Sequence, residues 1–236
     1  MSILITGVSS GIGHALARRY LENTNEAVLG LSRRKPDDLF RRERFSWCAL
    51  DLGHLDAIAA AVRTLVAEGE RFSLVILNAG LLGEIRDLAR TSIHELRHLM
   101  DVNLWSNKVL LEALWDRGAK IDQVVAISSG AAVKGHRGWG GYAMSKAALN
   151  MLMQIYAAER SDVHFSALAP GLVDTEMQEY MRTLPDSPEF ASVARLKAAH
   201  NTPAMPDADT AAARLADVIP RILQHPSGSF LDVRNL

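Results

Sequence analysis

Cysteine is almost absent from this sequence of 236 residues: Cys48 stands alone, so no disulfide can form within the chain. Proteins without disulfides suit a reducing compartment, and we therefore expect a cytoplasmic location. Long apolar runs are also missing, since none approaches the roughly 18 residues that a membrane-spanning helix needs. Strand-like sequence begins at residues 2–5, so we expect neither a signal peptide nor a membrane partner.

An excess of charge of either sign is missing too. The 26 basic and 27 acidic residues give a formal net charge of -1, so we expect no nucleic-acid partner. Residues 41–44 are basic but lack interleaved aromatic residues, and we interpret them as a solvated loop. His94 and His98 have a helical spacing but no third ligand, so no metal site is predicted.

Short apolar runs alternate with longer amphipathic segments along the chain. The predicted strands cover residues 2–6, 27–31, 45–50, 74–77, 123–127 and 164–168. The predicted helices cover residues 11–21, 55–66, 93–115, 142–158 and 210–223. Because the strands are apolar on both faces, they suit a parallel sheet covered by helices on both sides. The alternation predicts an α/β fold with a doubly wound sheet.

Residues 173–206 break this alternation. They contain four prolines and two short helical patterns, at 176–181 and 190–199, but no predicted strand. An insertion between the last crossover elements is a natural place for a lid over a ligand. We expect a substrate lid here, and a helical excursion without a binding role is the alternative.

A glycine-rich turn joins the first predicted strand to the first predicted helix. Its residues with a candidate role are Gly7, Ser9, Ser10, Gly11, Ile12 and Gly13. In this context glycines allow a tight turn and expose backbone N–H groups to a pyrophosphate at a helix N-terminus. The spacing, Gly-x-x-x-Gly-x-Gly, differs from Gly-x-Gly-x-x-Gly, and a plain tight connection is the alternative. The position after the first strand favours a dinucleotide site.

The residues after the second predicted strand bear on the choice of dinucleotide. NAD sites tend to place a carboxylate there for the ribose 2′-hydroxyl, whereas an arginine suits the 2′-phosphate of NADP. The chain has Ser32 and Arg33, with no acid before Asp37. A charge-assisted bond of about 1.5–3 kcal/mol is enough to set the preference. We therefore expect NADP(H), and a solvated basic loop is the alternative.

One tyrosine, one lysine and one serine have a spacing that suits proton transfer. Tyr142 and Lys146 lie four residues apart on one face of a predicted helix, with Ser129 thirteen residues before the tyrosine. Because an ammonium stabilises a phenolate, we expect Lys146 to lower the pKa of Tyr142 from about 10. Such a tyrosine can give a proton to a carbonyl oxygen or take one from an alcohol.

These motifs occur in an order that resembles the short-chain dehydrogenase/reductase family along nearly the whole chain. After the glycine turn come Asp51-Leu52, Asn78-Ala79-Gly80, Asn103, Ser129, Tyr142, Lys146 and residues 170–175. The resemblance implies a single-domain Rossmann fold over residues 1–236, with a sheet of about seven strands. It also implies an oxidoreductase that transfers hydride between a nicotinamide and a small carbonyl or alcohol substrate.

The family implies a catalytic role for four of the matched residues. Tyr142 would be the general acid or base, and Ser129 would orient the substrate oxygen. Lys146 would bind the nicotinamide ribose, and Asn103 would hold a water molecule in a proton relay.

Other matched residues would bind the cofactor. Asp51 and Leu52 would line the adenine pocket. The remaining positions are Asn78, Ala79, Gly80, Pro170, Gly171, Val173 and Thr175. Leu77 stands where many members have another asparagine, but Asn78 is retained.

Two segments are similar to the sepiapterin reductase and benzil reductase branch of the family. They are residues 138–142, which include Trp139, and residues 173–178. That branch reduces diketone side chains of pterins, or aromatic 1,2-diketones, with NADPH. Trp139 can stack on a flat substrate or serve as a structural plug, and both interpretations stay open. The other residues expected at the substrate are Leu82, Tyr180, Met181 and Asp232, the last by analogy with a pterin-anchoring aspartate.

We therefore predict an NADPH-dependent carbonyl reductase that acts on an aromatic or vicinal diketone. One alternative is an oxidoreductase of 3-oxoacyl thioesters, sugars or steroid alcohols. Another is a non-catalytic NADP-sensing regulator, which the intact Ser129, Tyr142 and Lys146 disfavour.

The segment around Trp105 and Trp115 carries a run of leucines at 110, 111 and 114. It marks either a subunit interface or ordinary core packing. Resemblance to the family favours a homodimer or homotetramer built on the middle helices.

Overall fold

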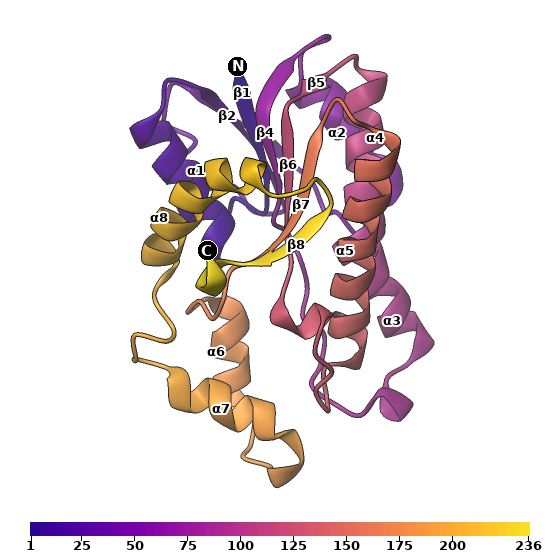
Figure 1. The fold of residues 1–236 in the computed structure, drawn as a ribbon, viewed down its shortest axis with the longest axis vertical. Helices are drawn as coiled ribbons and strands as arrows, with labels where there is room; N and C mark the ends of the chain where they lie inside the picture. The colour runs from indigo at the N-terminus through magenta and orange to yellow at the C-terminus, as the bar shows by residue number, and fades with distance from the viewer.

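The computed structural model describes residues 1–236, which form a parallel sheet with helices on both faces (Figure 1). Its eight strands follow the order β3-β2-β1-β4-β6-β7-β8, with β5 beside β4. They are β1 (Ser2–Thr6), β2 (Ala27–Ser32), β3 (Phe45–Ala49), β4 (Arg71–Leu77), β5 (Lys120–Ile121), β6 (Gln123–Ile127), β7 (His164–Ala169) and β8 (Ser229–Asp232). The predicted doubly wound fold is confirmed. The strand order runs in opposite directions from β1 and β4, which places a ligand crevice beyond their carboxyl ends.

Two hydrophobic cores lie on the two faces of the sheet. Helices α1 (Gly11–Asn23) and α8 (Ala208–Val218) cover one face, and α2 (Leu55–Leu65), α4 (Ser106–Asp116) and α5 (Gly140–Glu159) cover the other (Figure 1). Successive residues of a strand point to opposite faces. Ile3 and Ile5 of β1 accordingly join the core under α1 and α8, and Leu4 joins the other core.

The prediction of one helix over 93–115 is wrong. The structure has α3 (Ile93–Met100), a π turn at Asp101–Trp105, and then α4. A π turn adds one residue to a helical turn and often lies at a functional site. The three leucines at 110, 111 and 114 are fully buried within this subunit, so they belong to its own core. Only Trp105 of the two tryptophans is exposed, at 43%.

One predicted helix is shorter in the structure, and two strands of the sheet were not predicted. Helix α8 ends at Val218, and Pro220 lies in the 3-10 turn at Ile219–Gln224 that follows, because proline cannot donate the backbone bond of an α-helix interior. Strands β5 and β8 are absent from the sequence prediction. They contain only two and four residues, too few to show an apolar pattern.

Residues 173–206 fold as an excursion from the carboxyl edge of the sheet. It contains α6 (Glu176–Thr183) and α7 (Ala191–Ala199), which lie beyond the strand ends in Figure 1. The backbone N–H of Asp174 donates to Pro206 O at 2.9 Å, and Arg182 bonds to the Asp174 carboxylate at 2.6 Å. The two ends of the excursion are therefore held together.

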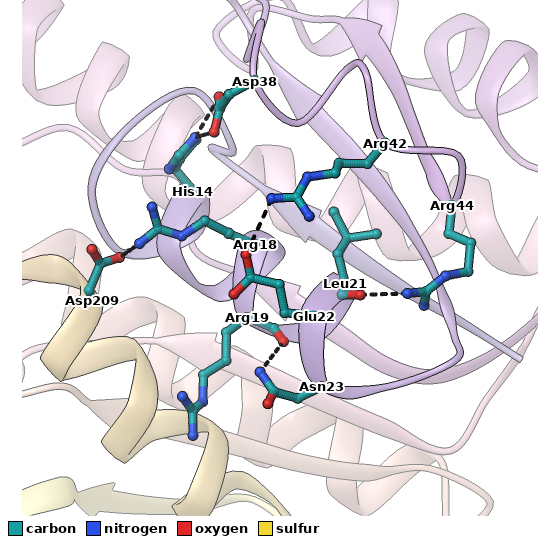
Figure 2. Close-up of polar contacts among 10 residues, drawn as sticks. All are labelled: His14, Arg18, Arg19, Leu21, Glu22, Asn23, Asp38, Arg42, Arg44 and Asp209. Atoms are coloured by element: carbon teal, nitrogen blue, oxygen red, sulfur yellow. Dashed lines mark hydrogen bonds and ion pairs between the residues drawn. The ribbon is translucent and has the colours of Figure 1, made fainter.

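Arg44, one of the basic residues at 41–44, forms hydrogen bonds with backbone carbonyls near the end of α1. Arg44 donates to the backbone carbonyls of Leu21, Thr24 and Glu26, as Figure 2 shows for Leu21. These carbonyls lie at or just after the end of α1, where helix carbonyls lack partners within the helix. The expectation of a purely solvated loop is therefore wrong for Arg44.

No helix in the structure combines the length and the apolar character that a bilayer span requires.

Candidate active site

A cavity of about 1120 Å³ opens at the carboxyl edge of the sheet. Every predicted site residue lines it except Gly13 and Asn103, which lie directly behind its wall. The structure therefore brings the glycine turn, the predicted catalytic residues and the predicted substrate residues around one space. Whether each of them binds or reacts as predicted stays a prediction.

The glycine turn runs from β1 into α1 with no room for side chains. A Cβ atom on Gly13 would lie 2.4 Å from both Gly7 O and Asn78 Nδ2, and Gly11 has a φ of +59° that favours glycine. Helix α1 begins after Ser10, whose side chain makes no capping bond, and its first turn has no acidic residue. The N–H groups of that turn are thus free of a competing carboxylate and fit a pyrophosphate.

Thr6, at the end of β1, holds the neighbouring strand end in register. Its Oγ1 accepts hydrogen bonds from the backbone N–H groups of Asn78 at 2.9 Å and Ala79 at 3.0 Å, and the residue is fully buried. Asn78 in turn donates from Nδ2 to Thr6 O at 2.9 Å. These bonds fix Asn78 against the glycine turn.

The end of β2 supplies the candidate residues for the adenosine half. Ser32 and Arg33 line the cavity, but the Ser32 hydroxyl donates inward to Arg34 O at 2.7 Å. Arg34 donates from Nη2 to both carboxylate oxygens of Glu176, at 2.9 and 3.1 Å. Arg33 forms no such pair and is exposed, so its guanidinium is free for an anion. Asp51 and Leu52 lie on the same wall of the cavity.

Three of the four predicted catalytic residues line the cavity: Ser129, Tyr142 and Lys146. Tyr142 is 8% exposed and Lys146 is 3% exposed, both on α5, and Ser129 follows β6. Lys146 Nζ donates to Ile127 O at 2.7 Å and lies 5.9 Å from the centre of the Tyr142 ring. Burial lowers the pKa of Lys146 to about 8.

The expected fall in the pKa of Tyr142 is wrong for this structure. Burial raises the pKa of the phenol, because the phenolate would lose its hydration, and an interaction with the Ser129 hydroxyl lowers it by less. The same burial lowers the pKa of Lys146, so the ammonium is a weaker partner than an exposed lysine would be. The phenol is consequently protonated at neutral pH.

Asn103 lies in the π turn, fully buried behind Lys146. Its Oδ1 accepts from Leu81 N at 2.7 Å, and its Nδ2 donates to Leu81 O at 2.8 Å and to Ser145 Oγ at 2.9 Å. A Cβ on Gly80 would lie 3.1 Å from Asn103 Oδ1 and 3.3 Å from Lys146 Nζ. Asn103 thus joins the loop after β4 to α5 beside the lysine.

The loop after β7 faces the glycine turn across the cavity. Pro170, Gly171, Val173 and Thr175 line the cavity. A Cβ on Gly11 would lie 3.4 Å from Thr175 Cγ2, which shows how closely the two loops approach. The loop is therefore placed to close the cofactor half of the cavity.

The substrate half of the cavity has an apolar floor beside the phenol. Leu82, Trp139, Tyr142 and Met181 form a small buried cluster. The Trp139 ring lies edge-on to Tyr142, with centroids 6.0 Å apart, and its Nε1 donates to Ser192 Oγ at 2.8 Å. Trp139 therefore both lines the cavity and joins the catalytic helix to α7.

Two other candidates for substrate contact also line the cavity. Tyr180 is 36% exposed at its edge. Asp232 accepts from Arg234 Nε at 2.9 Å, and this bond is the first cause of the lowered pKa of the Asp232 carboxyl. Its negative charge is already balanced, so a positively charged substrate group would compete with Arg234.

Several cavity residues have no role in the sequence predictions. Among the charged and polar ones are Arg34, Lys134, His136, Glu176, Ser192, Arg195 and Arg234. Most come from the excursion or from the loop after β6. The helical spacing of residues 192, 195 and 196 indicates that they share one face of a helix. The sequence does not show that this face lines the cavity, so their role could not be predicted.

Comparison with known proteins establishes the family. Residues 1–185 match the family model described as short chain dehydrogenase, so the chain belongs to the short-chain dehydrogenase family. It is 30% identical over 227 residues to a benzil reductase ((S)-benzoin forming) of Bacillus subtilis, covering 92% of each chain. It is 34% identical over 237 residues to the sepiapterin reductase of Meriones unguiculatus, covering 92% of this chain and 90% of that protein.

The fold agrees with a solved structure. The crystal structure of the KRED1-Pglu enzyme superposes with a TM-score of 0.86 at 25% identity, covering 98% of this chain and 100% of that one. The predicted family and branch resemblance are confirmed, as is an oxidoreductase. Family and site together define a short-chain carbonyl reductase that uses a nicotinamide cofactor and a small-molecule substrate.

Proposed function

We propose that this protein reduces aromatic or vicinal diketones with NADPH. The observation that carries the proposal is a buried, protonated phenol at Tyr142, beside the Ser129 hydroxyl and next to an apolar pocket floor. The chain is similar to benzil reductases, which by name act on an aromatic 1,2-diketone, and to sepiapterin reductases, which by name act on a pterin. Both similarities support a flat, aromatic carbonyl substrate.

The raised pKa of Tyr142 suits the reductive direction. When bound, the reduced nicotinamide supplies hydride to the carbonyl carbon, and negative charge then develops on the carbonyl oxygen. Tyr142 donates its phenolic proton to that oxygen, and Ser129 donates a hydrogen bond to the same atom. An acid that is protonated at neutral pH is ready for this step without prior uptake of a proton.

Lys146 is the residue that we expect to return a proton to the tyrosine, and Asn103 supports it from behind the cavity wall. With a pKa of about 8, Lys146 is still mostly protonated at neutral pH but gives up its proton far more readily than an exposed lysine, as a proton carrier should. Asn103 fixes the loop and the helix on either side of it. We assign these two residues to the relay that restores the phenol after each turnover.

The free N–H groups at the start of α1 would hold the pyrophosphate, and Arg33 would hold the 2′-phosphate. Arg34 is already engaged with Glu176, which leaves Arg33 as the arginine without a carboxylate partner at this end. Asp51, Leu52, Asn78 and Gly80 would shape the adenine and nicotinamide pockets.

The Arg33→Asp variant tests this choice of cofactor. We expect it to weaken NADPH binding by about 10- to 100-fold more than NADH binding, since it removes a charge-assisted bond and adds a repulsive charge. Arg41→Asp, at an exposed position outside the cavity, is the matched control. Equal losses for both cofactors would contradict the assignment to NADP.

The excursion at 173–206 is the proposed lid. It contributes Met181 to the pocket floor and Ser192 to the bond with Trp139. A panel assay that follows NADPH absorbance tests the substrate class: benzil and 1-phenyl-1,2-propanedione should be turned over faster than 3-oxoacyl thioesters, sugars and steroid ketones. Preference for one of the latter, or binding of NADPH without any turnover, would replace the proposal.

An exposed apolar stripe supports a homodimer or homotetramer. Met144, Met151 and Ile155 on α5 are 44%, 53% and 45% exposed and share one helix face, and Trp105 is also exposed. Analytical ultracentrifugation of the wild type and of Met151→Glu should show a dimer or tetramer that dissociates in the variant.

The lone Cys48 supports a cytoplasmic location, in which this thiol stays reduced.

A further inference from the structure

The rim of the substrate half of the cavity carries positive charge that the protein does not neutralise. Lys134, in the loop after β6, and Arg195, on α7, are the two cations that line it, and the imidazole of His136 lies in the same lining. Neighbouring cations that point elsewhere are paired: Arg137 bonds to Asp87, and Lys197 bonds to Asp186, each at 2.7 Å. Lys134 and Arg195 have no ion pair.

The position of Arg195 follows from the face that α7 turns to the cavity. Ser192 accepts the bond from the Trp139 indole, and Leu196 packs against the apolar cluster that contains Tyr142. Residues 192, 195 and 196 share one face of a helix. Arg195 therefore lies about one helical turn, roughly 5 Å, beyond the point where the indole is bound.

The positive charges of Lys134 and Arg195 both act on the His136 imidazole. Burial lowers the pKa of His136, and the positive charges of Arg195 and Lys134 lower it further. Three of the acids that line the cavity are already paired with other arginines: Glu84 with Arg86, Glu176 with Arg34 and Asp232 with Arg234. The fourth, Asp51, belongs to the proposed adenine pocket. A charged rim of this kind attracts and orients an anion, and its attraction extends into the cleft.

Resting on the proposed function, we infer that the substrate is an anionic ketone or diketone. Its apolar body would occupy the floor formed by Leu82, Trp139 and Met181. Its carboxylate or phosphate group, several bonds from the reacting carbonyl, would be bound by Arg195 and Lys134. Guanidinium groups bind carboxylates and phosphates alike through paired N–H donors. The structure therefore assigns to the substrate a negative charge beside Arg195 and Lys134, and the choice between the two anions is left to experiment.

Three matched probes test this inference: 4-carboxybenzil, its neutral methyl ester, and the phosphate ester of 4-hydroxybenzil. We expect kcat/KM for the better of the two anions to exceed that of the methyl ester by about tenfold at low salt. The preference should shrink as salt is raised to about 0.5 M, because salt screens exposed charges. The ratio of the two anions distinguishes a carboxylate from a phosphate as the natural group.

The variants Arg195→Gln and Lys134→Gln should each reduce the anion-to-ester ratio several-fold. Arg63→Gln, which removes an exposed arginine of α2 outside the cavity, should leave the ratio unchanged. Calorimetric binding of the same probes to the protein with NADP⁺ supplies a readout that does not depend on turnover.

The outcomes separate this inference from the proposed function. Turnover of the ester with no preference for either anion, or a preference that survives in Arg195→Gln and Lys134→Gln, overturns the inference alone. Tighter binding of an anion that depends on Arg195, without turnover of any probe, upholds the anion site and overturns the diketone reductase.

Discussion

Replacing Thr6 by valine should remove the bonds that hold the end of β4 against the glycine turn. Valine keeps the shape of threonine but has no acceptor for the N–H groups of Asn78 and Ala79, which lie 2.9 and 3.0 Å from Thr6 Oγ1. A buried donor without a partner costs about 1–3 kcal/mol. Two such donors give an expected loss of about 2–6 kcal/mol in the free energy of unfolding, toward the lower end because both bonds are only partly buried.

Thr6→Ser is the matched control because it keeps the hydroxyl and removes only a buried methyl group. That loss is expected to cost about 1 kcal/mol. Urea unfolding followed by circular dichroism measures both variants, and a fluorescence titration measures their affinity for NADPH. We expect Thr6→Val to be the less stable variant by at least 1 kcal/mol. We also expect it to bind NADPH more weakly, because Asn78 would keep only its Nδ2 bond to the backbone carbonyl of residue 6. A valine variant as stable as the serine variant would refute this reasoning.

Three further changes probe other parts of the structure. Gly13→Ala should abolish NADPH binding or unfold the protein, because its Cβ would lie 2.4 Å from two fixed atoms; a thermal melt should show little effect of Gly135→Ala, whose Cβ would meet nothing within 4 Å. The pKa of Lys146 is lowered to about 8, so the unfolded chain binds a proton between about pH 8 and 10.5 that the folded chain does not. The wild type should therefore gain up to about 3 kcal/mol in its free energy of unfolding, relative to Lys146→Met, as the pH rises from about 8 to 10.5. Urea titrations measure this difference between the two proteins, and a difference that stays flat or falls with pH would contradict the prediction. Arg44→Met should lower the free energy of unfolding by about 1–2 kcal/mol, since the carbonyls after α1 lose their donor; an unchanged urea midpoint would contradict that contribution.

The pattern of apolar residues was sufficient to predict the α/β architecture. A strand that is buried on both faces must be apolar at successive residues, and such runs can be recognised in the sequence. The alternation of Ile3, Leu4 and Ile5 between the two cores follows from strand geometry alone. The π turn at Asp101–Trp105 could not be predicted in this way, since one additional residue in a turn leaves the apolar spacing of a long helix almost intact.

The site was predictable where local chemistry requires a residue type. The glycine turn and the pair Tyr142 and Lys146 are of this kind, and the structure places them around one cavity. The raised pKa of Tyr142 was not predictable, because the burial that causes it is a tertiary property. The same holds for Arg195, whose place at the cavity depends on how α7 packs against Trp139.

Single-turnover oxidation of NADPH by benzil, in the wild type and in Tyr142→Phe, tests the role of the buried phenol most directly. A general acid contributes about 10²–10⁴-fold to the rate, so we expect a loss of that size with the affinity for NADPH unchanged within about twofold. Retention of a tenth or more of the wild-type rate in the phenylalanine variant would contradict the assignment of Tyr142 as the proton donor.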